Sequence, residues 1–181
     1  MASVRTHLWF GNNKAEEAAR FYAEHIPGSS VDRVYLAPEG GPGTPGEPLV
    51  VEFTVGGMPV TGLNAGPELQ LDEAFSFYLL VDTQEEVDHY WDVLTADGGE
   101  PGLCGWCKDR FGVSWQVIPK RLEELCGDYT TEANLRALRA MLGMHKIDIA
   151  ALEAAYAGEA DGAPDARGGG TAPRPAEVPG A

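Results

Sequence analysis

Apolar and polar residues follow two different periods in succession near the start of the chain. The segment THLWFGNNKAEEAARFY begins at Thr6 with the alternation typical of a strand. Helical spacing follows, with apolar residues at Ala15, Ala18, Ala19 and Tyr22. Asn13 stands where a helix N-cap is needed, and acidic residues fill the first turn. The pattern predicts a strand followed directly by a helix.

A second segment repeats this pattern 69 residues later. FSFYLLVDTQEEVDHYW places Asp82 at the predicted N-cap, with helical spacing at Val87, Tyr90, Trp91 and Leu94. A segment with a strand-like pattern follows each helix and ends in a hairpin that turns at a glycine, Gly57 or Gly112. The repeat predicts an α+β fold of two βαβββ modules, at about residues 4–66 and 74–119.

The first module is longer because it contains a Gly- and Pro-rich stretch, Ala37–Pro48. This stretch has no hydrophobic period and lacks the spacing of a phosphate-binding loop. It is predicted to be a flexible loop.

The chain continues beyond the second module with two amphipathic patterns. Thr131 is expected to cap a helix through Leu135, Leu138 and Met141, and Asp148 to cap another. From residue 158 no apolar side chain is larger than that of a valine, so this part is predicted to be disordered. The predicted organisation is a two-module domain at 1–122, a helical extension at 123–157 and a tail at 158–181.

Strand alternation sorts the predicted sheet residues onto two faces. One face should pack against the helices and comprises Leu8, Phe10, Phe77, Leu79, Val113, Trp115 and Val117. The opposite face is polar and aromatic and comprises His7, Trp9, Thr61, Ser76, Tyr78, Ser114 and Gln116.

The repeat makes His7 equivalent to Ser76 and Thr61 equivalent to Gln116, so the four positions should converge if the modules pack symmetrically. Two interpretations follow. The residues form a ligand or metal site centred on His7, or they are ordinary polar residues on a partly solvated sheet face, with His7 simply hydrogen-bonded.

Composition limits the partners of this 181-residue chain. A net charge of -15 would repel a phosphate backbone, so nucleic acid is not an expected partner. No stretch approaches the ~20 apolar residues of a membrane helix, and no charged segment followed by an apolar run opens the chain. A soluble, cytoplasmic protein with no membrane partner is expected.

Cys104 and Cys107 have the spacing of a redox pair or of half a zinc site. A redox cysteine needs a helix N-terminus, yet KDRFGVSW after Cys107 predicts a turn into a strand. A zinc site would need a second pair of ligands, which Cys126 and the distant His145 do not provide. Cys107 is therefore interpreted as a strand residue.

Four segments together resemble the PhnB-like, or 3-demethylubiquinone-9 3-methyltransferase-like, family of the vicinal oxygen chelate superfamily. They are HLWFGNNKAEEAARFY, FSFYLLVDTQEEVDHYW, CGWCKDRFGVSWQVIP and HKIDIAALEAAY, within residues 4–157. The resemblance implies paired βαβββ modules that form a cupped mixed sheet around a small-molecule site. It also implies a homodimer, with modules paired within or between chains.

The resemblance also implies one divalent metal ion, zinc, nickel, iron or manganese, at the first and fourth strand of each module. The matching positions are His7, Thr61 or its neighbours Leu63 and Asn64, Ser76 and Gln116, and only His7 is a usual ligand. The sequence lacks the Gly-rich turn of a Rossmann-like site, so no S-adenosylmethionine or nucleotide site is expected.

Three functions are compatible with these patterns. The first is a metal-assisted lyase, isomerase, transferase or dioxygenase, with His7 and Gln116 as catalytic residues. Its substrate would contact Trp9, Thr61, Asn64, Ser76, Tyr78, Trp106 and Ser114. The second is a metal-free drug- or metabolite-binding protein of the bleomycin-resistance type, which binds by aromatic stacking. The third is an interaction module whose helices after Tyr129 dock a partner.

Overall fold

A computed structural model describes residues 2–159 of the chain. The first module contains β1 (Thr6–Trp9), α1 (Ala15–His25), β2 (Ser30–Leu36), β3 (Pro48–Val55) and β4 (Met58–Leu63). The second contains β5 (Phe77–Val81), α2 (Gln84–Thr95), β6 (Glu100–Pro101), β7 (Trp106–Lys108) and β8 (Ser114–Pro119). The extension contains α3 (Lys120–Cys126), α4 (Glu132–Leu142) and α5 (Ile149–Ala157). The tail predicted at 158–181 lies outside the described residues from position 160.

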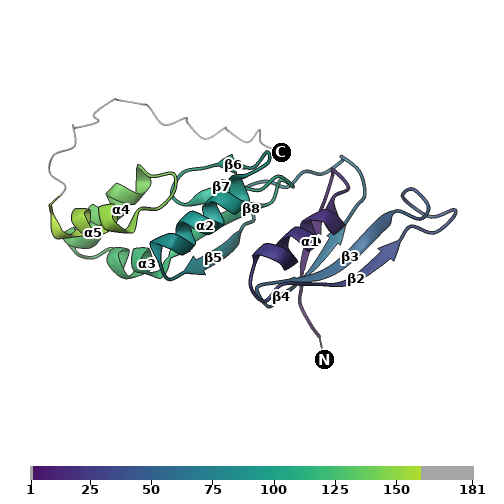
Figure 1. Cartoon of the computed structure of the whole chain (residues 1–181), viewed down its shortest axis with the longest axis horizontal. Coiled ribbons are helices and arrows are strands. Elements are labelled where there is room, and N and C mark those ends of the chain that lie inside the picture. Colours follow the sequence, from purple (N-terminus) through teal and green to yellow (C-terminus); the bar gives the residue numbers. More distant parts are fainter. Residues whose placement is uncertain (1, 160–181) are drawn as a thin grey trace, which may run out of the picture.

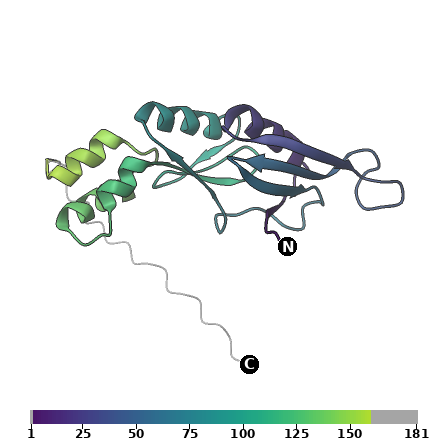
Figure 2. The same ribbon diagram turned by 90° about the horizontal axis from the view of Figure 1, so that it is seen from below.

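The two modules have the same topology, as the repeat predicted. The strand orders are β1-β4-β3-β2 and β5-β8-β7-β6, with the first and fourth strand of each module parallel and the other pairs antiparallel. The α+β fold of two βαβββ modules is confirmed, and its strands form two mixed sheets of four. Both helices lie on the same side of the sheets, so each sheet has a helix-covered face and an open face (Figures 1 and 2).

The Gly- and Pro-rich stretch lies between β2 and β3, where the second module has only a short connection. It closes on itself through two backbone hydrogen bonds between Ala37 and the pair Gly46 and Glu47, of 2.9 and 2.8 Å. The predicted loop therefore accounts for the extra length of the first module.

The helices begin differently from the prediction. Asn13 has φ 59° and does not cap α1; instead Asn64, at the end of β4, accepts a hydrogen bond from the Ala15 amide at 3.0 Å. In the second module the cap is Thr83, one residue beyond Asp82, which forms a capping box with Glu86. The spacing located the helices, but the cap of α1 comes from a residue 49 positions away and could not be found in a local pattern.

A buried carboxylate joins the two modules. Asp109, in the β7–β8 hairpin, accepts hydrogen bonds from the Tyr22 hydroxyl of α1 at 2.6 Å and from the Trp115 indole of β8 at 2.9 Å. Its other oxygen accepts from the backbone amides of Phe111 and Val113 at 2.9 and 3.0 Å. Burial raises the pKa of Asp109, while these four hydrogen bonds act in the opposite direction.

Aromatic rings surround this carboxylate and complete one core shared by both modules. The ring centroid of Tyr22 lies 5.3 Å from that of Trp115 and 6.3 Å from that of Phe77. The centroids of Phe21 and Phe111 are 5.6 Å apart, and all three pairs pack edge to face. Such pairs contribute about 0.5–1.5 kcal/mol each beyond their burial. The α1 helix of the first module is thus fixed against the sheet of the second.

The helical extension forms a smaller core at the far end of the second module (Figure 1). The predicted caps are confirmed: Thr131 caps α4 and Asp148 caps α5. Gln84 of α2 connects the extension to the module through hydrogen bonds of 3.0 and 2.9 Å to the carbonyl of Ile147 and the amide of Ile149. No helix within the described residues has the length and apolar character needed to span a bilayer.

The junction carboxylate yields a stability prediction. Asp109→Asn should lower the free energy of unfolding by about 2–4 kcal/mol, because the new amide nitrogen would face groups that are themselves donors. Asp97→Asn is the matched control, since that carboxylate is exposed and pairs with Arg110 at 2.8 Å. Asp97→Asn should lower the free energy of unfolding by less than about 1 kcal/mol. Urea unfolding followed by circular dichroism measures both, and equal losses would contradict the assignment.

Candidate functional site

The first group of predicted site residues lies on the open face of the first sheet. His7 and Thr61 are neighbours in register on the parallel strands β1 and β4, and His7 is exposed. Arg5 shares this face: its guanidinium donates to Glu52 at 2.9 Å and to Thr61 at 3.4 Å. The surroundings of His7 therefore already hold an ion pair, between Arg5 and Glu52.

The donor atoms at the four equivalent positions do not suit a divalent metal. His7 provides one imidazole, whereas Thr61 and Ser76 are neutral alcohols and the Gln116 amide donates to the Ser76 hydroxyl at 2.9 Å. The Glu52 carboxylate, in register with Thr61, is paired with the Arg5 guanidinium at 2.9 Å and so is already engaged by a cation of the protein. Within residues 2–159 no group of three or more His, Cys, Asp or Glu side chains could hold a metal ion. The residues present do not fit the metal that the resemblance implied.

A second group of predicted residues lies together on the open face of the second sheet. Gln116 of β8 lies between Tyr78 of β5 and Trp106 of β7, in register with both. All three line a cavity of about 280 Å³. Ser76 adjoins it through its hydrogen bond from Gln116.

The helical extension completes this cavity. Residues of α3, α4 and the turn between them form the wall opposite the sheet, namely Leu122, Glu123, Cys126, Tyr129, Leu138 and Met141. The Tyr78 hydroxyl donates to the Glu123 carboxylate at 2.8 Å, which links sheet and helix across the cavity. Burial and this carboxylate raise the pKa of Tyr78, so its phenol stays protonated at neutral pH.

Glu123 and Tyr129 were not among the predicted site residues. Glu123 lies one turn into a helix that begins directly after β8, and Tyr129 lies in a turn between helices. Local periodicity could locate the helices of the extension, but it could not show that they close over Tyr78, 45 residues before Glu123.

Trp9 is separate from this group. It lines another cavity, of about 360 Å³, at the junction of the modules together with Gln70, Lys108 and Phe111. Its indole donates to the carbonyl of Gly66 at 2.8 Å, and Lys108 pairs with Glu73 at 2.6 Å. Trp9 and Tyr78 therefore do not enclose one site within a single chain.

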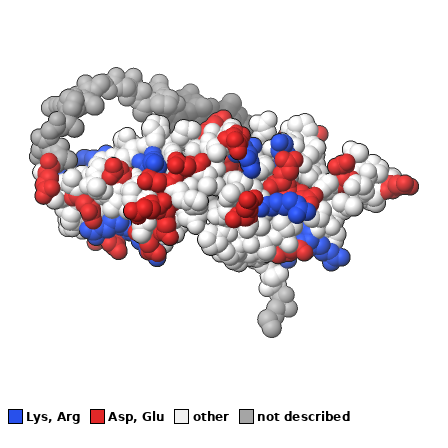
Figure 3. Space-filling view, in the orientation of Figure 1, with Lys and Arg blue, Asp and Glu red and all other residues white. Residues whose placement is uncertain are grey.

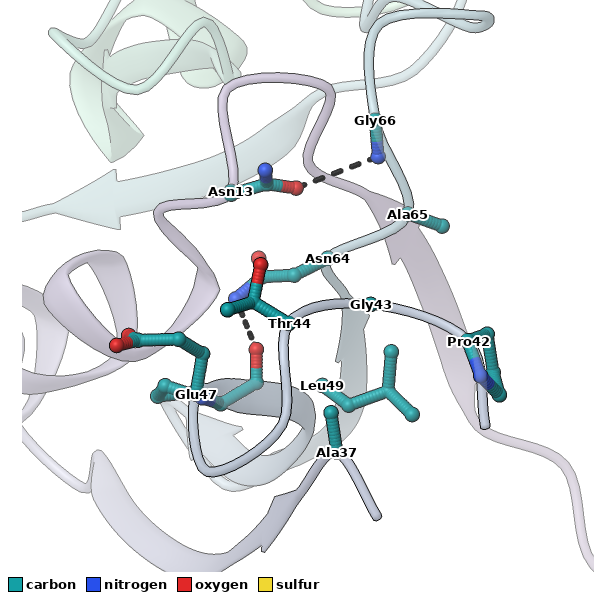
Figure 4. A pocket seen from close by; sticks show the side chains of 11 residues that line it. Asn13, Ala37, Pro42, Gly43, Thr44, Glu47, Leu49, Asn64, Ala65 and Gly66 are labelled. Atoms are coloured by element: carbon teal, nitrogen blue, oxygen red, sulfur yellow. Dashed lines mark hydrogen bonds between the residues drawn. The ribbon is translucent and has the colours of Figure 1, made fainter. Parts of the chain in front are cut away.

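Asn64 and Ser114 are buried and hold the backbone in place. Asn64 caps α1 and donates to the carbonyl of Pro48 at 2.9 Å, and Ser114 lies 3.4 Å from the carbonyl of Asp72. Asn64 also borders a cavity of about 430 Å³ under the loop 37–48 (Figure 4). There the Asn13 side chain accepts a hydrogen bond from the Gly66 amide at 3.3 Å. The two asparagine side chains of this cavity are therefore engaged in supporting the backbone.

The Cys-Gly-Trp-Cys segment runs from the β6–β7 connection into β7, as the hairpin interpretation predicted. Cys107 is a buried strand residue of β7, and both cysteines are free thiols. Burial, with a smaller effect from Asp109, raises the pKa of Cys107 to about 12. A thiol with this pKa does not act as a redox nucleophile at neutral pH.

The model of the family described as 3-demethylubiquinone-9 3-methyltransferase matches residues 2–118. The chain belongs to this family. The match ends within β8, so the extension, including the HKIDIAALEAAY segment, lies outside it. Among curated proteins none matches.

Several solved structures are similar to this chain, and the first of those described below supports the same fold. The PhnB protein from Bacillus cereus is 28% identical with a TM-score of 0.59, over 65% of this chain and 99% of that one. Protein PA1353 from Pseudomonas aeruginosa is 21% identical with a TM-score of 0.48, over 65% and 98% of the two chains. A gene product from Arabidopsis thaliana is 17% identical with a TM-score of 0.41, over 64% and 96%.

The buried thiol gives a second prediction. At pH 8 only about one Cys107 side chain in ten thousand is ionised, because the pH is about four units below its pKa of about 12. Iodoacetamide should therefore modify the more exposed Cys104 in the native protein and modify Cys107 only after unfolding. Peptide mass spectrometry measures both. Modification of native Cys107 as fast as Cys104 would support the redox pair instead.

Proposed function

We propose that this family member binds a small molecule, without a metal ion, on the open face of its second sheet. The observation that carries the proposal is the placement of Tyr78, Gln116 and Trp106 side by side across three strands that line one cavity. Two aromatic rings with a neutral amide between them suit a flat or partly aromatic molecule, which the amide would orient by a hydrogen bond.

The exposure of the aromatic residues supports the proposal. Tyr78 is 50% exposed and Tyr129 is 56% exposed, and both border the same cavity. Large aromatic side chains left open to solvent around a cavity are typical of a binding site. The site is also firmly built, because Gln84 fixes the extension to the second module.

A metal-assisted reaction centred on His7 receives less support. The four predicted positions supply one imidazole, two alcohols and one amide, and the neighbouring Glu52 carboxylate is already paired with Arg5 at 2.9 Å. A homodimer remains a prediction from the family resemblance. If the modules paired between two copies of the chain, a site would still be formed by His, Thr, Ser and Gln side chains. The atoms available to a metal ion would therefore be the same.

A neutral dye tests the proposal. Nile red should bind the full chain with about one site, and excess chelator should leave its affinity unchanged. Trp106→Ala should weaken binding about tenfold, since truncating a central aromatic contact costs more than ~1 kcal/mol. Tyr78→Ala, at a half-exposed position that tolerates truncation, should act in the same direction.

Trp9→Ala and His7→Ala are the matched controls, because neither residue lines this cavity. Both should leave the affinity for the dye unchanged, and elemental analysis should find less than one metal ion per chain. Loss of dye binding on chelation or in His7→Ala, or no binding at all, would contradict the proposal.

A further inference from the structure

The cavity between the second sheet and the helical extension has an unusual chemical lining. Three aromatic side chains border it, from Tyr78, Trp106 and Tyr129, and the remaining walls are mainly aliphatic or sulfur-containing. Among the described residues that line it, Glu123 alone is charged, and none is Lys, Arg or His. The lining therefore combines electron-rich rings with one negative charge.

This combination favours a cation. The faces of Trp and Tyr rings attract ammonium groups, including at exposed sites. The carboxylate of Glu123 accepts from Tyr78 on one oxygen, and its negative charge would attract an ammonium group in the cavity. An anionic ligand would meet this carboxylate without a compensating positive charge from the described lining residues.

The basic residues near Glu123 are engaged elsewhere. On α3, Arg121 pairs with Glu124 and Glu153 at 2.9 and 2.8 Å, and Lys120 pairs with Asp82 at 2.5 Å. Their cationic groups therefore compensate other carboxylates. Acidic side chains are also spread along the face of the molecule in Figure 3, consistent with a net charge of -15 that attracts cations.

The backbone holds Tyr129 at the cavity in a conformation that tyrosine rarely adopts. Tyr129 has φ 61°, and its amide donates to the carbonyl of Cys126 at 3.1 Å. A bulky residue in the left-handed region costs free energy, and such residues are concentrated at binding and active sites. The turn between α3 and α4 thus places an aromatic residue at the cavity that Glu123 also lines, beyond the part of the chain that the family match covers.

We infer that this cavity binds a small hydrophobic organic cation, with the ammonium group between the three aromatic rings and the Glu123 carboxylate. The inference rests on the proposed binding function and adds the ligand class. It also assigns a role to the extension: Glu123 and Tyr129 give the site its preference for positive charge, while Gln116 and Trp106 form its floor.

A matched set of probes tests the preference for charge. Equilibrium dialysis of the full chain would compare benzyltrimethylammonium, its neutral isostere neopentylbenzene, and phenylacetate as an anion. The cation should bind about tenfold or more tightly than the neutral isostere, and the anion should bind most weakly. The two isosteres have nearly the same shape, so the ratio reports charge recognition.

Two variants locate the preference. Glu123→Gln keeps the acceptor for Tyr78 but removes the charge, and it should reduce the cation-to-neutral ratio to about threefold or less. Glu124→Gln is the matched control on the same helix, outside the cavity lining, and should keep the full ratio. Tyr129→Leu should lower the affinity for the cation about threefold and leave the affinity for the neutral isostere nearly unchanged.

The outcomes separate this inference from the proposed function. Equal affinity for cation and neutral isostere, or a ratio that Glu123→Gln does not lower, overturns the inference while Nile red binding still supports the site. Failure of all three probes overturns the inference, and the dye experiment then decides the proposed function by itself. If the exposed tyrosines instead contact a second copy of the chain, Tyr129→Leu should change the dimerisation constant and leave the probe affinities unchanged. That result would also overturn the inference.

Discussion

The arrangement of the two modules depends on one buried carboxylate and the aromatic rings around it. Asp109 accepts four hydrogen bonds, from α1 of the first module, from β8 of the second and from its own hairpin. Of these four hydrogen bonds, the one from Tyr22 crosses between the modules, so separating or rotating them would remove a partner from a buried carboxylate. The aromatic rings around it add packing that acts in the same direction. The modules are consequently held with both helices on one side and both open faces on the other (Figure 2).

The candidate site follows from this frame together with the helical extension. The second sheet has its helix-covered face in the shared core, so only its open face can carry Tyr78 and Gln116 to solvent. The extension begins directly after β8 and is fixed to α2 by Gln84. Its α3 and α4 helices therefore close over one end of that open face and convert it into a cavity. The family match stops before this extension, so features of the cavity wall belong to this chain and are not given by the family fold alone.

The sequence predicted the fold better than the site. The repeat of strand and helix patterns gave both modules, and alternation correctly assigned Leu8, Trp115 and their neighbours to the buried face. Alternation also put Tyr78 and Gln116 on one face, where they line one cavity. These are local properties, because the period of side chains along a strand is set by the backbone.

Features that depend on residues far apart could not be predicted in this way. Asn64 caps α1 from the end of β4, and Glu123 contacts Tyr78 from a helix beyond the repeat. The role of Asp109 has the same origin, since its partner Tyr22 lies 87 positions away. Whether Trp9 and Tyr78 share a site depends on the relative orientation of the two modules, which a periodic pattern does not encode. In the structure they line different cavities.

The central claim is that ligand binding occurs at the cavity between β5, β8 and the extension, and not around His7. Resonance assignment of the full chain, followed by titration with benzyltrimethylammonium, tests it most directly. The account predicts shifts of the Trp106 indole and the Gln116 side-chain amide, with the His7 imidazole and Trp9 indole unchanged. Shifts centred on His7 and Trp9, with Trp106 and Gln116 unaffected, would contradict it.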